Sequence, residues 1–331
     1  MMIMAAPQRG ISRRDLLGWT TVIGAGAGLA GCATPGGEAT GPAGTRTVEH
    51  PLGRSEIPVA PRRIIALDAG AGLQTSLEAG VPLIASETLA GEVSVPDYLP
   101  RPPEGFQPLG FNEIDLERIT ALAPDLIIGS RARVEELYEP LSKIAPTVPF
   151  LNTSDRARWR DTAVTVGDLL GARPEIERRL TEFDAAVKTF TDTHADRLNQ
   201  RTVALVRFTA DEVRILTGVI FPADLLAQCG VRRPKSNEPK EADATYISLS
   251  QENVPVLADA DVIVYFSGGG GSAKDSGGMF SKVTEGPLWR RLPAVAAGRA
   301  FPVSAVNWWD GYSTSAGRAC LTDLDGIFGK L

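Results

Sequence analysis

The sequence predicts an α/β protein made of two Rossmann-like lobes that a single long α-helix joins. Residues 174–201 place apolar side chains at the three-to-four spacing of one helix face, more regularly than any other stretch of the chain. More than a hundred residues on each side of this stretch alternate between buried-strand and helix patterns, as α/β lobes do. At 1.5 Å per residue the helix is about 42 Å long, which is enough to connect two bodies.

The first 32 residues have the features of an export leader. Arg13 and Arg14 resemble the pair of a twin-arginine signal, and the leader ends in Leu-Ala-Gly-Cys, which resembles a bacterial lipobox. The uncharged run at 16–31 is too weakly apolar for the alternative, a permanent membrane span. We therefore expect cleavage before Cys32 and a lipid on Cys32 that anchors an extracytoplasmic protein to the cell membrane.

Composition limits the partners of the mature chain. Loss of the leader removes three arginines and one aspartate, so the formal charge changes from −6 to about −8. An acidic body argues against a nucleic-acid partner, and we expect a monomer. The only histidines are His50 and His194, too few for a transition-metal site built from side chains, so we expect no directly bound metal or cofactor. Gly26, Gly28 and Gly31 match GxGxxG but follow no strand.

The chain then divides into a tether and three structural parts. Residues 33–45 are rich in Gly, Pro, Ala and Thr and predict a flexible tether. Residues 46–173 predict the N-terminal lobe, with a hairpin at 46–61, strands at 63–67, 82–85, 125–129 and 148–151, and helices at 73–79, 116–122, 134–144 and 158–170. Residues 174–201 predict the interlobe helix, because Pro174 suits a first helical position and Arg197 and Arg201 suit the last turn.

Residues 202–331 predict a C-terminal lobe that repeats the first. Strands are expected at 203–206, 213–216, 261–264 and 300–303, and helices at 223–228 and 314–328. In both lobes a Glu at the start of a helix stands five residues before a Leu, and an Asp-headed apolar strand follows. These residues are Glu117 with Leu122, and Glu252 with Leu257. The matched spacing indicates a duplicated unit.

Ligands of open α/β sheets bind at the carboxyl ends of the strands. Arg131 and Arg133 follow the strand at 125–129, and Arg207 and Phe208 follow the strand at 203–206. The planar fork of Arg suits anionic or hydroxamate oxygens, so we expect these residues to contact the ligand. Ordinary salt bridges at the rim are the alternative for the three arginines.

The segment after the last strand holds Trp308, Trp309 and Tyr312, a candidate aromatic wall for a bulky ligand. We expect one tryptophan in the core and the other at the ligand. The glycine-rich run at 267–274 lacks the GK[ST] ending of a phosphate loop and predicts a rim loop. Serine and cysteine nucleophile patterns are missing, so the chain is not expected to be an enzyme. Cys229 and Cys320 are expected to be buried thiols, with a bond between them as the alternative.

Taken together, these residues resemble the substrate-binding lipoproteins of bacterial ABC importers for ferric siderophores, which are related to haem and vitamin B12 binders. The resemblance covers nearly the whole mature chain. It rests on the runs at 61–67, 116–128, 141–147, 159–161, 203–208 and 288–299. It implies a helical-backbone periplasmic binding protein, with the ligand between two lobes. It also implies that Glu117 and Glu252 form salt bridges with arginines of a dimeric permease.

The expected function is therefore capture of an Fe(III)–siderophore complex and its delivery to an ABC permease for iron uptake. A siderophore fills the coordination positions of ferric iron, which fits a pocket without histidines. Hydroxamates are the first choice, and catecholates or carboxylates the second. Cobalamin or haem binding is an alternative in the same family. A nucleotide-dependent enzyme that uses the turn at 70–72 is a distant one, because Thr75 stands where the third glycine belongs.

Overall fold

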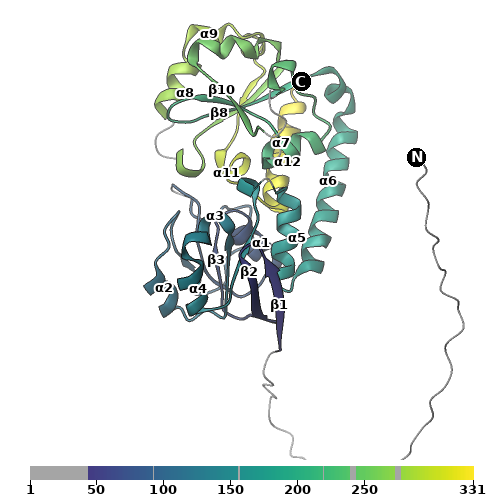
Figure 1. Ribbon diagram of the computed structural model, residues 1–331. Coiled ribbons are helices and arrows are strands. Elements are labelled where there is room, and N and C mark those ends of the chain that lie inside the picture. The colour runs from purple at the N-terminus through teal and green to yellow at the C-terminus, as the bar shows by residue number, and fades with distance from the viewer. Residues whose placement is uncertain (1–43, 92, 156, 219, 239–243, 273–276) are drawn as a thin grey trace, which may run out of the picture. The chain divides into compact units, whose positions relative to one another are not determined.

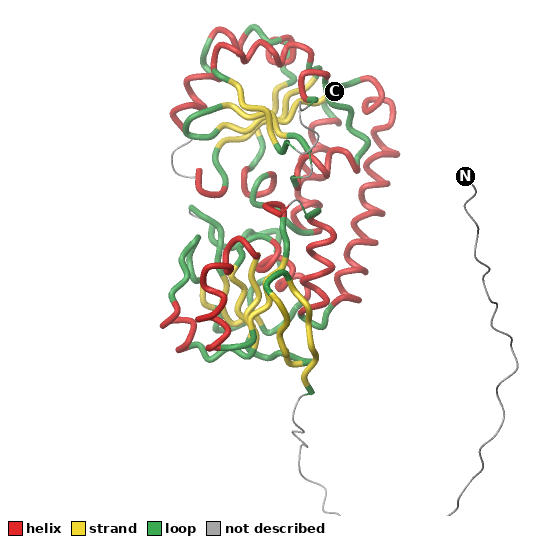
Figure 2. The backbone as a smooth tube through the Cα atoms, viewed as in Figure 1, coloured by secondary structure: helices red, strands yellow, loops and turns green. Residues whose placement is uncertain are grey.

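The structure is a computed structural model and describes residues 44–331, except 92, 156, 219, 239–243 and 273–276 (Figure 1). The predicted leader, its lipobox Cys32 and most of the predicted tether lie outside the described residues. The described chain has two lobes, and each lobe is built on its own β-sheet (Figure 2).

The N-terminal lobe contains a five-stranded parallel sheet in the order β5-β4-β3-β6-β7. Its strands are β3 (Ile64–Leu67), β4 (Leu83–Ser86), β5 (Gln107–Pro108), β6 (Leu126–Ser130) and β7 (Thr147–Phe150), after a hairpin of β1 (Thr45–His50) and β2 (Gly53–Pro58). Its helices are α1 (Ala71–Ala79), α2 (Leu116–Ala121), α3 (Arg131–Val134), α4 (Tyr138–Ile144) and α5 (Trp159–Leu169), with 3-10 turns η1 (Glu135–Leu137) and η2 (Thr153–Asp155). The predicted hairpin and the four predicted strands are confirmed to within one residue at most ends.

The single helix predicted over residues 134–144 is wrong. The chain instead forms α3, the 3-10 turn η1 and then α4. Pro140 is the cause we assign, because proline has no N–H to donate and its ring would clash with the carbonyl of residue 136 in a continuous helix. A new start at Tyr138 places Pro140 in the first turn of α4, where its N–H is not needed.

The C-terminal lobe contains a five-stranded mixed sheet in the order β10-β9-β8-β11-β12. Its strands are β8 (Val203–Phe208), β9 (Val213–Leu216), β10 (Tyr246–Leu249), β11 (Val262–Ser267) and β12 (Ala300–Pro302). Its helices are α7 (Phe221–Gln228), α8 (Gly277–Thr284), α9 (Pro287–Arg290), α10 (Pro293–Ala296), α11 (Ala305–Trp308) and α12 (Thr314–Phe328), with 3-10 segments η3 (Lys235–Asn237), η4 (Gln251–Asp259) and η5 (Gly270–Ser272).

The two sheets have the same strand order and differ in the direction of one strand. Counted along the chain, the strands of each sheet lie in the order third, second, first, fourth, fifth. In the C-terminal lobe β9 is antiparallel to both of its neighbours. The link from β8 to β9 is only residues 209–212, and such a short link permits a hairpin, whereas a parallel neighbour needs a crossover of about a dozen residues. The lobes are therefore a repeat with one strand reversed.

The long helix α6 covers Arg173–Gln200, as the sequence predicts, and extends over 28 residues. Its buried residues are those of the predicted stripe: Ile176, Leu180, Phe183, Val187, Phe190, His194 and Leu198. α6 contacts α5 of the N-terminal lobe and α12 of the C-terminal lobe, and the three helices lie along one side of the protein (Figure 1). The helix therefore joins the lobes by packing along both of them.

The two lobes share a hydrophobic core where these helices meet. Trp159 at the start of α5 packs edge-on against Phe183 of α6 and Phe221 of α7, with ring centroids 5.8 and 5.3 Å apart. The indole N–H of Trp159 donates to Asp224 Oδ2 on α7 at 3.0 Å. An N-terminal-lobe helix thus contributes a fully buried tryptophan to the main core of the C-terminal lobe.

We predict that Gly317→Ala destabilises the protein. A Cβ added at Gly317 on α12 would lie 2.6 Å from the ring of Phe183, which is fully buried against Trp159. We expect a loss of about 1–3 kcal/mol in the free energy of unfolding. Gly326→Ala is the matched control on the same helix, because a Cβ there meets no atom within 4 Å. That variant should gain up to about 1 kcal/mol. Urea unfolding measures both, and equal stability of the two variants would contradict tight α6–α12 packing.

Candidate functional site

A pocket of about 330 Å³ lies at the carboxyl edge of the N-terminal sheet. Asp68 follows β3, Glu87 follows β4, Ser130 ends β6 and Asn152 stands two residues after β7, and all four line it. Parallel strands end at the same edge of a sheet, which brings these polar groups together. The residues of the C-terminal lobe that line the pocket are Gly270, Trp309, Asp310 and Tyr312. The pocket therefore lies between the two lobes.

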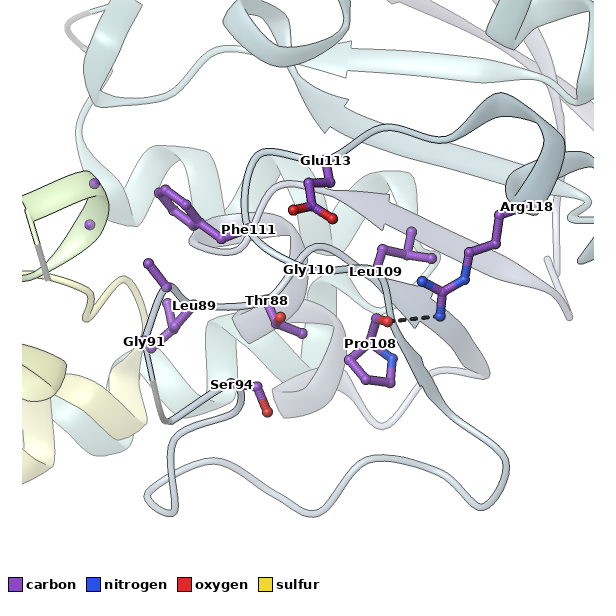
Figure 3. A pocket seen from close by; sticks show the side chains of 13 residues that line it. Thr88, Leu89, Gly91, Ser94, Pro108, Leu109, Gly110, Phe111, Glu113 and Arg118 are labelled. Carbon is purple, nitrogen blue, oxygen red and sulfur yellow. Dashed lines mark hydrogen bonds between the residues drawn. The ribbon is translucent and has the colours of Figure 1, made fainter. Parts of the chain in front are cut away.

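A second cavity of about 660 Å³ adjoins the first and shares Leu89, Phe111 and Gly270 with it. We call the two cavities together the cleft. Figure 3 shows Leu89 and Phe111 on one side of the second cavity and Arg118 on the other, where Arg118 donates to the carbonyl of Pro108 at 2.9 Å. The cleft thus joins polar groups at the strand ends to a larger second cavity beside them.

Of the two predicted arginines after β6, Arg133 lines the cleft. Its Nε and Nη2 both donate to the carboxylate of Glu87, which is 2% exposed. Burial raises the pKa of Glu87, and the facing guanidinium opposes this rise. Arg131 instead donates to Asp155 and Glu135 and is not among the cleft residues, so it makes the salt bridges that were the alternative.

Arg207 lies behind the cleft wall. Its side chain is 3% exposed, and its Nε and Nη2 donate to the carbonyls of Gly268 and Gly269 at 2.8 and 2.7 Å. The guanidinium lies 3.4 Å from the ring centroid of Trp309, a cation–π contact. Burial, followed by the charge of Arg214, lowers the pKa of Arg207 to about 10. Its Nε and Nη2 thus hold the wall, and Arg207 is not among the cleft residues.

The prediction that Phe208 lines the site is wrong. Its ring is fully buried and packs edge-on against Tyr265, Phe280 and Trp289 in the core of the C-terminal lobe. Consecutive residues of a strand point to opposite faces, so Arg207 and Phe208 cannot both face the same side of β8.

The two tryptophans lie in different surroundings. Trp308 is fully buried and donates its indole N–H to Asp323 at 2.8 Å, whereas Trp309 lines the cleft. Tyr312 also lines the cleft, and its hydroxyl lies 2.9 Å from Thr153 Oγ1 of the N-terminal lobe. The glycine-rich loop supports this wall, because a Cβ at Gly269 would lie 2.7 Å from Trp309. That close approach requires glycine.

Sequence reasoning missed several cleft residues, among them Asp68, Glu87, Leu89, Phe111, Asn112 and Asp310. Asp68 and Glu87 follow β3 and β4 directly, so the same rule about strand ends could have identified them. Phe111 and Asn112 belong to a loop, and Asn112 has a left-handed φ of 59°, which Asn tolerates better than most residues. No sequence pattern predicted that this loop would line the site.

Residues 83–304 match the family model described as "Periplasmic binding protein". The chain belongs to this family. It is 32% identical over 293 residues to the "Probable siderophore-binding lipoprotein YfiY" of Bacillus subtilis, covering 86% of this chain and 88% of the relative. It is 24% identical to the "Iron(3+)-hydroxamate-binding protein FhuD" of Bacillus subtilis, covering 80% of this chain and 81% of that one. The crystal structure of Staphylococcus aureus SirA complexed with staphyloferrin B superposes with a TM-score of 0.72 at 27% identity, covering 86% of this chain and 99% of SirA.

The duplicated glutamates of this binding protein occupy equivalent places in the two lobes. Glu117 lies in α2, which precedes β6, and Glu252 lies in η4, which precedes β11, each the fourth strand of its sheet. Both side chains are exposed. The second element is a 3-10 segment where we expected a helix, and it contains Pro255, which an α-helix interior does not accept. Despite this difference, each carboxylate stands in the element that precedes the fourth strand of its sheet.

Cys229 and Cys320 are not among the cleft residues. They are buried free thiols, and burial raises the pKa of both, that of Cys229 to about 12. Within the described ranges, no group of three or more His, Cys, Asp or Glu side chains is placed to hold a metal ion. Among the helices of the described part of the chain, none is long and apolar enough to cross a membrane.

We predict that the stability penalty at Asp310 depends on pH. Burial raises the pKa of this cleft carboxyl to about 6, although Gly270 N–H donates to its Oδ1 at 2.8 Å. Because the folded pKa lies above the ordinary value of 3.8, the favourable contribution of the protonated group is complete below pH 3.8 and is lost as the pH rises through 6.

Asp310→Asn keeps an oxygen for Gly270 and removes the charge. Its melting temperature should match that of the wild type near pH 4 and exceed it at pH 7.5, because the ionised Asp310 lowers the free energy of unfolding by at most about 3 kcal/mol for a shift of two pKa units. Calorimetric melting across this pH range measures the difference. A constant difference at every pH would contradict the assignment.

Proposed function

We propose that this protein is an exported, lipid-anchored binding protein that captures a ferric siderophore, of the hydroxamate type, between its lobes and delivers it to an ABC permease. The observation that carries the proposal is the cleft, which joins polar strand ends to an aromatic wall. The names of the relatives support the ligand class, and the lipobox at Cys32 and the arginine pair of the leader support the anchor and the export route.

The charges of the cleft favour a ferric complex without a large negative charge. Among its described residues the carboxylates are Asp68, Glu87, Glu113 and Asp310, and the guanidiniums are Arg118 and Arg133. Arg133 is already paired with Glu87, and Arg118 bonds the Pro108 carbonyl. Three singly charged hydroxamates cancel the charge of Fe(III), whereas three catecholates leave a large negative charge. Placing that charge beside buried carboxylates is unfavourable in a site of low dielectric.

Aromatic side chains of the cleft supply apolar contacts in addition to the polar ones. Phe111 comes from the N-terminal lobe, and Trp309 and Tyr312 come from the C-terminal lobe. Aromatic rings offer large apolar contact areas to the hydrocarbon spacers of a siderophore. The open outer edge of Arg133 can donate to chelating oxygens, because only its Nε and Nη2 are used by Glu87.

We predict that a ferric tris-hydroxamate binds more tightly than the other iron complexes. Trp309 in the cleft wall should report binding as quenching of tryptophan fluorescence. Titrations with a ferric tris-hydroxamate, a ferric tris-catecholate, ferric citrate, haem and cobalamin should give the lowest Kd for the hydroxamate, by about tenfold or more, equal to about 1.4 kcal/mol. Tightest binding of the catecholate or citrate would overturn the hydroxamate assignment. Binding of haem or cobalamin alone would overturn the siderophore assignment.

We also propose that Glu117 and Glu252 dock this protein on the permease. Two exposed carboxylates, one on each lobe, can pair with one cation on each half of a dimeric partner and steer its association. Interaction of these helix-start residues with their own helix dipoles is the alternative. The alternative predicts a small loss of stability and no loss of transport.

We predict that Glu117→Ala combined with Glu252→Ala abolishes uptake of the ferric ligand by cells while leaving its Kd unchanged. The matched control is Asp192→Ala with Asp196→Ala, which removes two exposed carboxylates from α6. Uptake of radioactive iron and fluorescence titration measure the two properties. Normal uptake by the Glu117 and Glu252 double variant would reject the docking role.

A further inference from the structure

Residues 309–312, which we call the aromatic segment, belong to the C-terminal lobe in sequence and are fixed from both lobes. The segment connects α11 to the start of α12 and contributes Trp309, Asp310 and Tyr312 to the cleft. Loops that form a binding wall usually take their order from the lobe that carries them. Here the backbone of the segment is hydrogen-bonded to α1 of the N-terminal lobe.

Gln74 of α1 makes this connection. Its side chain is fully buried, its Nε2 donates to the carbonyl of Asp310 at 2.6 Å, and its Oε1 accepts from the N–H of Tyr312 at 2.9 Å. One amide thus pairs with two backbone groups of the segment. Gly311 lies between them, and a Cβ there would lie 2.3 Å from the carbonyl of Asn307. The surrounding C-terminal lobe therefore leaves no room for a side chain at the centre of the segment, which Gln74 holds from the other side.

The other contacts of the segment continue into the C-terminal lobe. The carboxylate of Asp310 accepts from the N–H of Gly270, which lines both cavities of the cleft. Trp309 is held between the guanidinium of Arg207 and the backbone of Gly269. A continuous series of contacts thus leads from Gln74 through Asp310 to Gly270 in the glycine-rich loop of the C-terminal lobe.

Two further contacts hold the flanks of the segment to the N-terminal lobe. Glu78 stands one helical turn after Gln74, and its Oε1 accepts from Thr314 Oγ1 and from the N–H of Ser315, both at 2.7 Å. This carboxylate sits at the start of α12, where the helix has free N–H groups. The hydroxyl of Tyr312 meets Thr153. Gln74 is nevertheless the contact that fixes the backbone between the two aromatic side chains.

Loss of the Gln74 amide leaves two buried backbone groups without partners. An unpaired buried polar group is unfavourable, so the segment would shift to regain hydrogen bonds to water or to other groups. That shift moves Trp309 and Tyr312 together, because the two unpaired groups belong to Asp310 and Tyr312. Ligand binding would then have to restore the order that the free protein already has.

We propose that Gln74 is a positioning residue for ligand binding. From the N-terminal lobe it fixes the positions of Trp309 and Tyr312 in the cleft wall and, through Asp310, the position of Gly270 in the glycine-rich loop. It touches no ligand, since it is not among the cleft residues. This inference rests on the proposed function, because the wall is assigned to a ferric siderophore.

The test compares Gln74→Met with Thr75→Val. Met keeps the length of the side chain and removes both hydrogen bonds. Thr75 is the next residue of α1, is fully buried, and its hydroxyl has no partner among the described residues, so Thr75→Val controls for a change inside the helix. With a ferric tris-hydroxamate, Gln74→Met should raise Kd by about tenfold relative to Thr75→Val, measured well below both melting temperatures. A Kd within twofold of the control would overturn the proposal.

Hydrogen exchange tests the same contact without a ligand. The amide of Tyr312 donates to Gln74, so the peptide that covers the aromatic segment should exchange faster in free Gln74→Met than in Thr75→Val. Equal exchange would overturn the positioning role, whatever the affinities. If the wild type binds no iron complex of the panel and exchange is nevertheless faster, the positioning of the segment stands and the proposed ligand class fails.

Discussion

The packing of α6 against α5 and α12 is the constraint on which the rest of the structure depends. A lone helix of 28 residues could bend between two lobes, but α6 lies against a helix of each lobe, and Trp159 of α5 reaches into the core of the C-terminal lobe. Interiors packed to crystal-like density resist small displacements. The separation of the two sheets, and with it the position of the cleft walls, is therefore set by a shared core.

Local features of the sequence predicted the parts of the fold that depend on local periodicity. The buried stripe of α6 and the limits of α12 follow from the 3.6-residue repeat and from the residues that suit helix ends, so both were predicted closely. The failures lie where one residue changes the local rule. Pro140 divides a helix in the N-terminal lobe, and Pro255 accompanies a 3-10 segment in the C-terminal lobe. The short link between β8 and β9 could have predicted that the two strands are antiparallel. The apolar pattern within a strand does not give its direction, because direction depends on the strand with which it pairs.

The candidate site was predictable as a place and much less as a set of side chains. The rule of strand ends led to the edge of the sheet where the cleft lies, yet it could not decide between neighbouring residues. Arg133 lines the cleft and Arg131 does not, and Trp309 lines it and Trp308 does not. Arg131 and Arg133 are two positions apart on the short helix α3 and so point to nearly opposite sides of it, and Trp308 and Trp309 are neighbours at the end of α11. Which member of each pair faces the cleft therefore depends on how these short elements pack. Gln74 was hidden for a further reason, since its partners are backbone atoms more than two hundred residues away.

The shared core also determines which contacts between the lobes are the weaker ones. A wall that is already ordered by hydrogen bonds lowers the entropy cost of binding. Release then requires a partner to disturb that order. The shared core at α5, α6 and α12 buries large aromatic side chains and resists opening, whereas each of the two hydrogen bonds that Gln74 makes to the backbone of Asp310 and Tyr312 contributes only about 0.5–1.5 kcal/mol. A force applied to both lobes, as docking through Glu117 and Glu252 would apply it, separates the weaker contacts first. On the proposed docking, the contacts that order the wall would therefore also be the first to open for release.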